Sequence, residues 1–466
     1  MRTLLISICA GWFLAAGCAG PASAPARPET GETWMSTWLM GQKIGYTVLR
    51  YTGSGAGYRF ESVMKMEIAM AGINQQVSTR HVAVTGSDLT LQSFDFRFES
   101  RDRVMSAEGA VQGNELVVRG RDDKPRVIKL DGPVYPMPAL GILAVRRFAA
   151  GDSAFEVPVF DATLLSMTRV KVAFEGRDSV TVGGERLGAL RVRTEMAGFP
   201  VETWLDEKGM ALREESPPGM TSERTTPEEA VAEVRGGELD LLKMFRVAVD
   251  TTVPNPEAVR RVTYELTGVG DELQLDYDNQ EVVSTDPFVL GITVPDLPAG
   301  TVPLPVPGQA EFLKPSLEVQ CDDPALVAKA REAVGSPEDA VAGARTLVSW
   351  VFTALDKEPT ASFPTALDVL KHMKGDCNEH AVFFAALARA VGIPTKVAVG
   401  LVYMEGAFYY HAWNEVFVGR WVPVDATFGE FPASALHIKM REGGLSEQAR
   451  ILAAVGRIGI RIRSFR

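Results

Sequence analysis

The fold of this chain is decided by one stretch near its C-terminal end, Gly375-Asp376-Cys377-Asn378-Glu379-His380-Ala381-Val382-Phe383-Phe384. Asp376 suits the N-cap of a helix and Glu379 follows three residues later, so the two residues predict a capping box. The apolar run that continues to Ala390 contains one charged residue, Arg389. Such a run predicts a helix that is buried on nearly all sides. Cys377 would then be the first residue of a buried helix.

The start of a helix is a position that changes the chemistry of a thiol. Unpaired N–H groups and the helix dipole stabilise an anion there, and the thiolate is the nucleophilic form of cysteine. We therefore expect the pKa of Cys377 to lie below the ordinary value of about 8.5. A thiol at the mouth of a buried helix also opens onto a cleft, as nucleophilic catalysis requires.

Two further motifs lie on predicted strands. A Gly392-Ile393-Pro394 turn ends the helix, and alternating residues then predict strands over 396–404, 407–418 and 421–428. The second of these strands carries His411-Ala412-Trp413-Asn414-Glu415. The third carries Trp421-Val422-Pro423-Val424-Asp425-Ala426-Thr427.

The register of this hairpin decides whether His411 and Asp425 meet. A two-residue turn at Gly419-Arg420 would point the two side chains to opposite faces of the sheet. A three-residue connection with a bulge would pair Phe417 with Trp421 and leave His411 diagonal to Asp425, within side-chain reach. A functional pair therefore requires the odd-length connection.

Taken in order, the motifs resemble the transglutaminase-like superfamily of papain-like thiol enzymes. Members of that family show G-x-C-x-x-x-A, a G-I-P turn, H-A-W-x-E and D-x-T, and the match covers roughly residues 317–440. The resemblance implies an α+β fold in which a papain-like transglutaminase core follows antiparallel β-rich N-terminal and middle domains. It also implies an enzyme that acts on protein or peptide amide bonds through a thioester intermediate.

The resemblance assigns a role to each of three residues. Cys377 would be the nucleophile, His411 the base and then the acid, and Asp425 the group that orients the imidazole ring and steadies its cation. The backbone N–H of Cys377 would stabilise the oxyanion. Transfer to water gives hydrolysis or deamidation and transfer to an amine gives cross-linking, and the sequence does not choose between them. No cofactor and no metal ion are expected.

Structural explanations compete with these roles. Cys377 could be an inert core thiol, or it could form a disulfide with Cys321 in an oxidising compartment. Cys377, His380, His411 and Asp425 could form a zinc set. His411 could also be a satisfied core histidine. A binding or scaffold protein with a vestigial thiol domain is the corresponding alternative for the whole chain.

Other residues near the motifs have no single interpretation. Trp413 suits packing, and Glu415 suits either the surface or a place beside the site. His81, His372 and His437 have no partner that the sequence identifies.

The N-terminus indicates export to the cell envelope. An apolar run over 4–16 follows a basic start and is too short to span a bilayer. Leu14-Ala15-Ala16-Gly17-Cys18 resembles a bacterial lipobox, which implies a signal peptide over 1–17, a lipidated Cys18 and a flexible tether over 18–33. The protein would then contact the membrane through a lipid anchor and face the periplasm. A plain secretory signal or an uncleaved anchor is the alternative.

The remaining sequence predicts two or three domains, because 466 residues exceed one hydrophobic core. Alternating runs between turn signals predict an antiparallel β-rich domain over 34–235, curved around a helix over 138–149. This arrangement resembles the half-barrels of periplasmic lipoprotein-carrier-like domains. A small β region with a Pro-rich linker follows over 236–316, then the catalytic domain over 317–440 and a C-terminal extension over 441–466.

Composition excludes several classes of partner. Apolar residues make up 46% of the chain and charged residues 23%, which are values of globular proteins. The net charge of −11 is spread without a long acidic run, so it favours solubility and no affinity for nucleic acid. Beyond the signal peptide we predict no transmembrane segment. With 4 cysteines in the chain, two of them in the predicted signal region, no disulfide framework is expected.

Overall fold

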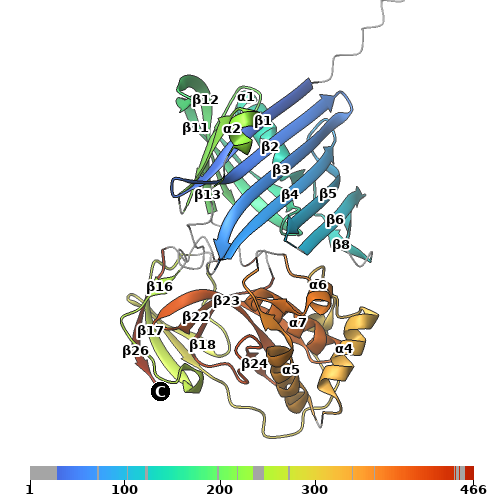
Figure 1. Cartoon of the computed structure of the whole chain (residues 1–466), viewed down its shortest axis with the longest axis vertical. Helices are drawn as coiled ribbons and strands as arrows, with labels where there is room; N and C mark the ends of the chain where they lie inside the picture. The colour runs from blue at the N-terminus through green and yellow to red at the C-terminus, as the bar shows by residue number, and fades with distance from the viewer. Residues whose placement is uncertain are drawn as a thin grey trace, which may run out of the picture.

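The computed structural model describes residues 29–466 except 71–72, 102, 121–123, 197–198, 218, 233, 235–245, 271–272, 338, 361–362, 445–446, 448–450 and 452–456. The predicted signal peptide and the predicted lipidation site Cys18 lie outside the described residues. The described chain has the expected α+β fold, with a large antiparallel sheet preceding a mixed C-terminal body (Figure 1). None of the described helices has both the length and the apolar character needed to cross a membrane.

The N-terminal sheet has 15 strands among the described residues, in the order β8-β7-β6-β5-β4-β3-β2-β1-β15-β14-β13-β12-β11-β10-β9. Neighbouring strands are antiparallel except β9 and β10, which are parallel. The strands are β1 (Glu29–Leu39), β2 (Gln42–Ser54), β3 (Gly57–Met70), β4 (Ile73–Thr85), β5 (Leu91–Ser100), β6 (Arg103–Gln112), β7 (Glu115–Arg119), β8 (Pro125–Lys129), β9 (Tyr135–Pro136), β10 (Ala154–Asp161), β11 (Ser166–Val182), β12 (Glu185–Met196), β13 (Phe199–Leu205), β14 (Ala211–Ser216) and β15 (Met220–Thr225).

The start of β1 corrects the predicted tether. Residues 29–33 were expected to be flexible, but Glu29 pairs with Gly53 and the ladder to β2 continues to Leu39. The Pro- and Ala-rich composition therefore describes only the part of the tether before Glu29.

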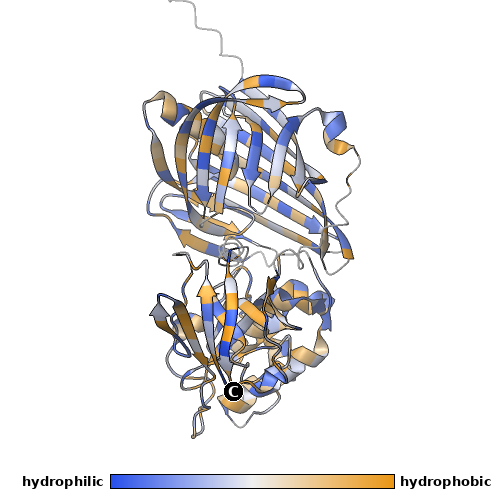
Figure 2. Ribbon diagram, turned by 90° about the vertical axis from the view of Figure 1, so that its left-hand side faces the viewer, coloured by the Kyte–Doolittle hydropathy of each residue, from blue (hydrophilic) through white to orange (hydrophobic). Residues whose placement is uncertain are grey.

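One helix lies inside the curved sheet, as the sequence predicts. A short 3-10 turn, η1 (Met137–Ala139), leads into α1 (Leu140–Ala149). Leu140 and Leu143 of this helix share one hydrophobic cluster with Phe94 of β5, Val159 of β10 and Val192 of β12. Because one helix touches strands from both halves of the sheet, the sheet must curve around it. Hydrophilic and hydrophobic residues alternate along these strands, as a sheet with one buried face requires (Figure 2).

The C-terminal body combines two small sheets with a group of helices. In the described residues β24 and the run β16-β23-β22-β25 form one sheet, and β18-β19-β17-β26 form another. The preceding helix is α2 (Pro227–Val231). The elements are β16 (Val247–Ala248), η3 (Pro256–Ala258), β17 (Arg261–Thr267), β18 (Gln280–Thr285), β19 (Phe288–Thr293), η4 (Ala310–Leu313), α4 (Pro324–Val334), α5 (Ala340–Ala354), β20 (Asp356–Lys357), α6 (Ala366–His372), β21 (Lys374–Gly375), α7 (Cys377–Ala390), β22 (Thr395–Met404), β23 (Ala407–Phe417), β24 (Trp421–Val424), β25 (His437–Glu442) and β26 (Gly459–Phe465).

The three segments expected beyond residue 235 share one hydrophobic core. Tyr264 of β17 and Ile460 of β26 belong to the same cluster as Phe383 of α7 and Leu401 of β22. The predicted C-terminal extension supplies β26, which pairs with β17 across nearly two hundred residues of sequence. The middle β region, the core and the extension therefore form one body.

The two bodies meet where the ends of β4 and β5 contact Pro359 and Phe363 of the C-terminal body. The ring of Phe363 packs edge-on against Phe98 of β5, at 4.5 Å between centroids. The Gln75 side chain donates to the Pro359 carbonyl at 2.9 Å. This junction lies directly before α6 and α7, so the N-terminal sheet contacts the segment that leads to Cys377.

Candidate active site

The helix that begins at Cys377 has the predicted cap. The Asp376 carboxylate accepts the N–H of Asn378 at 2.8 Å, and the Glu379 carboxylate accepts the N–H of Asp376 at 2.9 Å. Both arms of the capping box are present. Residues 379–388 are all buried, which confirms the prediction of a helix enclosed on nearly all sides.

The turn that follows the end of α7 requires a glycine for two reasons. Gly392 has φ of +85°, a left-handed conformation that favours glycine. A Cβ atom there would also lie 2.5 Å from Cβ of Pro305. The helix therefore stops where the predicted Gly392-Ile393-Pro394 turn places it, and β22 starts at Thr395.

The hairpin of β23 and β24 has the odd-length connection. Phe417 pairs with Trp421, and the ladder continues to Asn414 opposite Val424. The three residues 418–420 form the connection, closed by a bond from the Val418 N–H to the Arg420 carbonyl at 3.0 Å. This is the register in which His411 can reach Asp425.

His411 and Asp425 are joined directly. Nε2 of His411 lies 2.7 Å from Oδ2 of Asp425, and both side chains are buried. The Phe428 ring stacks on the imidazole at 4.9 Å between centroids and 9° between planes. Among the described residues no hydrogen bond takes Nδ1 of His411. One nitrogen is therefore fixed by the carboxylate, and the other is left for a proton donor.

The Cys377 thiol lies at the edge of β23 beside these two residues. The β24 ladder ends at Asn414, and the N–H of Ala412 points from the same edge toward the Cys377 sulphur. Tyr410 and Asn414 bond to Asn378 and to the carbonyl of Ala381, at 3.4 and 3.0 Å, which holds the strand against the first turns of α7. Among the described residues no hydrogen bond joins the thiol to His411.

The pKa prediction for the thiol is wrong in direction. Burial and the neighbouring Asp376 carboxylate raise the pKa of Cys377 well above its ordinary value, although the Ala412 N–H acts the other way. A helix dipole contributes about 0.3 to 1 kcal/mol, which is less than the cost of enclosing an unpaired anion. Both influences favour the neutral form of the thiol, although the Cys377 side chain is only partly buried.

A second histidine contacts Asp425, and sequence reasoning missed it. Nε2 of His437, on β25, lies 3.0 Å from the Oδ2 atom that His411 also contacts. Burial alone would raise the pKa of Asp425, but the two imidazoles hold it well below its ordinary range. Oδ1 of Asp425 accepts the N–H groups of Thr427 and Phe428 at 2.7 and 3.2 Å. No pattern around His437 signals this contact, because β25 reaches the site by pairing with β22.

The alternative zinc set of Cys377, His380, His411 and Asp425 does not form among the described residues. Among the described residues, the ligand atoms that gather within 4.8 Å of one another are those of His411, Asp425 and His437, without Cys377 or His380. Nδ1 of His380 lies 2.6 Å from the Asp376 carbonyl instead. The Nε2–Oδ2 separations in the histidine–aspartate cluster are hydrogen-bond distances, so we assign these side chains to one another and not to a metal.

The two thiols of the described chain stay apart. Both Cys321 and Cys377 are free, so the disulfide alternative is excluded. Cys321 is buried, and its sulphur contacts the Leu313 carbonyl at 3.4 Å. It precedes α4, whose N-cap is Asp323. Burial raises the pKa of Cys321 as well.

Two other residues of the H-A-W-N-E motif are structural. Trp413 is buried, and its ring meets that of His437 edge-on at 5.2 Å between centroids. Glu415 is buried and accepts from Nζ of Lys439 with both oxygens, each at 2.7 Å. Burial raises the pKa of Glu415, against the effect of the Lys439 cation. Glu415 is therefore a buried ion-pair partner and not a surface carboxylate.

An arginine of the N-terminal sheet supports the start of α7. Arg103 of β6 is 5% exposed, and its Nη1 lies 3.4 Å from Oε1 of Glu379, the residue that completes the capping box. Its Nη2 donates to the carbonyl of Lys374, three residues before Cys377. The sequence does not reveal this contact, because more than 270 positions separate the partners.

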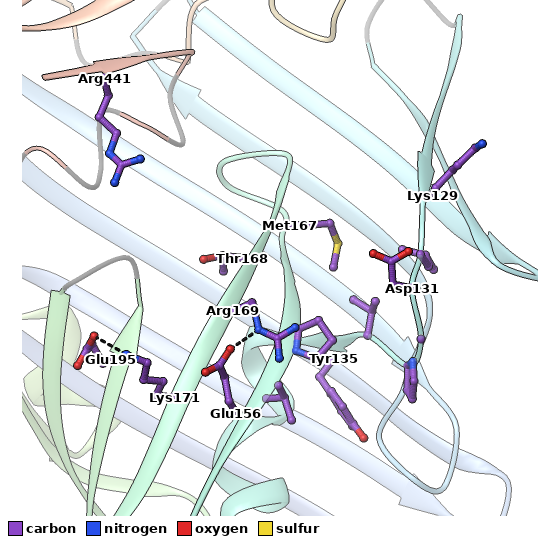
Figure 3. A pocket seen from close by; sticks show the side chains of 16 residues that line it. Lys129, Asp131, Tyr135, Glu156, Met167, Thr168, Arg169, Lys171, Glu195 and Arg441 are labelled. Carbon is purple, nitrogen blue, oxygen red and sulfur yellow. Dashed lines mark hydrogen bonds and ion pairs between the residues drawn. The ribbon is translucent and has the colours of Figure 1, made fainter. Parts of the chain in front are cut away.

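A separate hollow of about 770 Å³ lies at the open edge of the N-terminal sheet (Figure 3). Ion pairs occupy part of its wall, between Arg169 and Glu156 and between Lys171 and Glu195. Arg441 of the C-terminal body faces the same space. Neither Cys377, His411 nor Asp425 lines it, so it is distinct from the candidate active site.

Comparison with known families agrees with this geometry. Residues 327–426 match the transglutaminase-like superfamily. These residues contain α5, α6, α7 and the β22–β24 strands, with Cys377, His411 and Asp425. The C-terminal body thus holds a transglutaminase core.

Solved structures show weaker likeness. A β-barrel-like protein of domain of unknown function DUF1849 from Brucella abortus is 13% identical and covers 44% of this chain and 98% of its own, with a TM-score of 0.35. A candidate cysteine protease from Cytophaga hutchinsonii is 18% identical over 45% of this chain and 87% of its own, at a TM-score of 0.31. A candidate protease from Parabacteroides distasonis is 12% identical over 76% and 64%, at 0.19. At these TM-scores the likenesses carry no mechanistic weight. No curated protein matches the chain.

Proposed function

We propose that this protein is a thiol enzyme of the cell envelope that opens amide bonds of proteins or peptides, with Cys377 as nucleophile, His411 as base and Asp425 as orienting group. The observation that carries the proposal is the 2.7 Å bond from Nε2 of His411 to Asp425. It fixes the imidazole ring and leaves Nδ1 for the thiol. This is the division of labour that a Cys-His-Asp triad needs.

The reaction begins with a neutral thiol, because burial raises the pKa of Cys377. Nδ1 of His411 takes the S–H proton as the sulphur attacks the amide carbon. The backbone N–H of Cys377 has no acceptor among the described residues and is free to donate to the developing oxyanion. Proton transfer and attack are therefore coupled, which is general base catalysis.

In the second half of the catalytic cycle, His411 gives up the proton that it took from the thiol. The protonated His411 gives its proton to the leaving nitrogen as the C–N bond breaks, and a thioester on Cys377 remains. Water or an amine then attacks the thioester, His411 takes the proton of the attacking group, and the S–C bond breaks with return of that proton to sulphur. Hydrolysis and amine transfer share these steps and differ in the acceptor.

The cellular setting of the proposal follows from the N-terminal sequence. A lipidated Cys18 would tether the enzyme to a membrane with its catalytic body in the periplasm, where protein and peptide substrates are available. The N-terminal sheet would stand between the anchor and the thiol domain, since it follows the tether in sequence and contacts the segment that leads to α7.

Alkylation by iodoacetamide tests the role of His411 without knowledge of the substrate. We expect the rate of Cys377 modification, measured by peptide mass spectrometry, to fall at least about tenfold in His411→Gln, because general base catalysis contributes roughly 100-fold or more. His372→Gln is the matched control, because His372 ends α6 and contacts the Asp368 carbonyl away from the site. Its rate should equal that of the wild-type protein.

The opposite result favours the scaffold alternative. If Cys377 reacts at one rate in the wild-type protein and in His411→Gln, the imidazole does not serve the thiol. Cys321 provides an internal reference in every sample, because its thiol donates to the Leu313 carbonyl and lies apart from His411. Its modification should not depend on His411.

A further inference from the structure

His437 contacts two acceptors at once. Its Nε2 lies 3.0 Å from Oδ2 of Asp425, and its Nδ1 lies 3.1 Å from the backbone carbonyl of Ser434. A carbonyl oxygen and an ionised carboxylate can only accept hydrogen bonds. Oδ1 of Asp425 accepts two backbone N–H groups, and the two imidazoles at Oδ2 hold the pKa of this carboxyl well below its ordinary range, so Asp425 is ionised.

Each neutral form of His437 would face one acceptor with a lone pair. With the proton on Nδ1, the Nε2 lone pair would point at Oδ2 of Asp425. With the proton on Nε2, the Nδ1 lone pair would point at the Ser434 carbonyl, and the Ser434 hydroxyl at 3.4 Å would be the remaining donor. Only the imidazolium satisfies both contacts, because both of its ring nitrogens donate.

We propose that His437 is held as an imidazolium that neutralises the charge of Asp425. Asp425 can then orient the His411 ring without drawing a second proton onto that ring. His437 is then a positioning residue: it contacts neither the thiol nor a reacting atom and acts through Asp425. The inference rests on the proposed function, in which His411 must be an unprotonated base.

The electrostatics of the cluster support this assignment. The charged or titratable groups that face His437 are Asp425, Glu430 and His411, and aromatic rings of Trp413 and Phe428 complete its surroundings. Burial by itself would lower the pKa of His437, but the bond to Asp425 and the carboxylates of Glu430 and Asp425 raise it. The negative charge of Asp425 is therefore already neutralised by the His437 cation, without a positive charge on His411.

A neutral residue in place of His437 would remove the positive charge beside Asp425. The full negative charge of Asp425 would then act on the imidazole of His411 alone. An opposite charge at such distances shifts a titration by about one to three pH units. Alkylation of Cys377 in the variant would therefore need a higher pH.

Imidazole nitrogen NMR reads the charge of His437 directly. The full chain has 5 histidines, so selective ¹⁵N-histidine labelling gives few signals, and the set that disappears in His437→Gln belongs to His437. We expect this set to show two protonated nitrogens from about pH 5 to pH 8, well above the ordinary histidine pKa of about 6.5. A neutral tautomer of His437 at pH 7 would overturn the proposal.

The pH profile of Cys377 alkylation reads the consequence for His411. In His437→Gln the midpoint of the rise in rate should move up by about one pH unit, which is about a tenfold lower rate on the acidic side. His437→Lys keeps a cation beside Asp425 and should keep a midpoint near that of the wild-type protein. A His437→Gln profile that coincides with the wild-type one, in a protein whose alkylation does depend on His411, contradicts the proposal.

The two readouts separate this inference from the proposed function. If His411→Gln leaves alkylation unchanged, the proposed function fails, whereas the NMR experiment still decides whether His437 is a cation. If His411→Gln slows alkylation but His437 is neutral, the proposed function stands and the charge assignment falls. If His437→Gln does not fold, its NMR spectrum shows this, and the signals that disappear in His437→Lys then assign His437 in the wild-type spectrum.

Discussion

The N-terminal sheet and the C-terminal body differ in how deeply they bury charged side chains. Ion pairs of the sheet lie on its exposed face, such as Lys171 with Glu195, whose side chains are 64% and 39% exposed. The C-terminal body also encloses charges around the candidate active site: Asp425 is fully buried between two histidines, and Lys439 meets Glu415 at 6% and 4% exposure. A buried charge is destabilising unless it is paired, so the difference identifies where the fold retains charge for a reason other than solubility.

Arg103 is the exception that connects the two regions. Among the described residues of the N-terminal sheet, the buried charged side chains are Arg103 and Asp161. Asp161 accepts the N–H groups of Thr163 and Leu164 in its own turn. The side chain of Arg103 instead extends from β6 to the C-terminal body, where it pairs with Glu379 at the start of α7. The one buried cation among the described residues of the sheet therefore pairs with the helix that begins at Cys377 in the other body.

The largest effect should come from the charge at the centre of the C-terminal body. Asp425→Asn leaves the His437 cation buried without its counter-ion, and removal of one partner of a buried pair costs about 3 to 5 kcal/mol of unfolding free energy. Urea unfolding followed by tryptophan fluorescence measures this loss. The double variant Asp425→Asn/His437→Gln should lose less than the sum of the two single variants. Strict additivity would show that the two charges do not interact.

The pH dependence of this pair has a defined window. The folded pKa of Asp425 is lowered, so its contribution is present above the unfolded value of about 3.9 and is lost as the pH falls. The folded pKa of His437 is raised, so its contribution is complete below about 6.5 and is lost as the pH rises through the folded value. The difference between the wild-type protein and the double variant should be greatest between these limits.

A smaller effect is expected at the contact between the two bodies. Arg103→Met should cost roughly 2 to 3 kcal/mol, below the usual cost of breaking a buried pair, because Glu379 keeps its bond to the Asp376 N–H. Alkylation of Cys377 should also slow severalfold, since the first turn of α7 loses a support. Arg101→Met is the matched control: Arg101 meets Glu358 across the same junction but is 38% exposed. Equal effects of the two variants would show that the buried pair of Arg103 contributes no more than the exposed pair of Arg101.

The smallest effect should lie on the exposed face of the sheet. Lys171 and Glu195 are paired directly across β11 and β12, and exposed pairs contribute about 0 to 1 kcal/mol. Lys171→Ala should change the unfolding free energy by less than about 0.5 kcal/mol and leave Cys377 alkylation unchanged. A loss as large as that of Arg103→Met would mean that exposure does not separate the two regions.

Short-range signals made part of the active site predictable. The capping box needs only Asp376 and Glu379, three residues apart, and it places Cys377 at the first turn whatever surrounds the helix. Strand side chains alternate with a period of two, so the sequence showed that His411 could meet Asp425 only if Phe417 paired with Trp421, and the structure has this pairing. The α+β class and the curved N-terminal sheet follow likewise from local alternation along the strands.

Long-range packing decided the rest. The sequence by itself determined the helix that presents Cys377, because the cap and the apolar run lie close together in the chain. It also reduced the register of the hairpin to two possibilities, and the structure selected the one that joins His411 to Asp425. Only the tertiary structure brought His437 to Asp425 on a strand that pairs elsewhere, and Arg103 to Glu379 from another sheet. It also reversed the expected pKa of Cys377, because burial depends on what encloses a residue, and no local pattern carries that information.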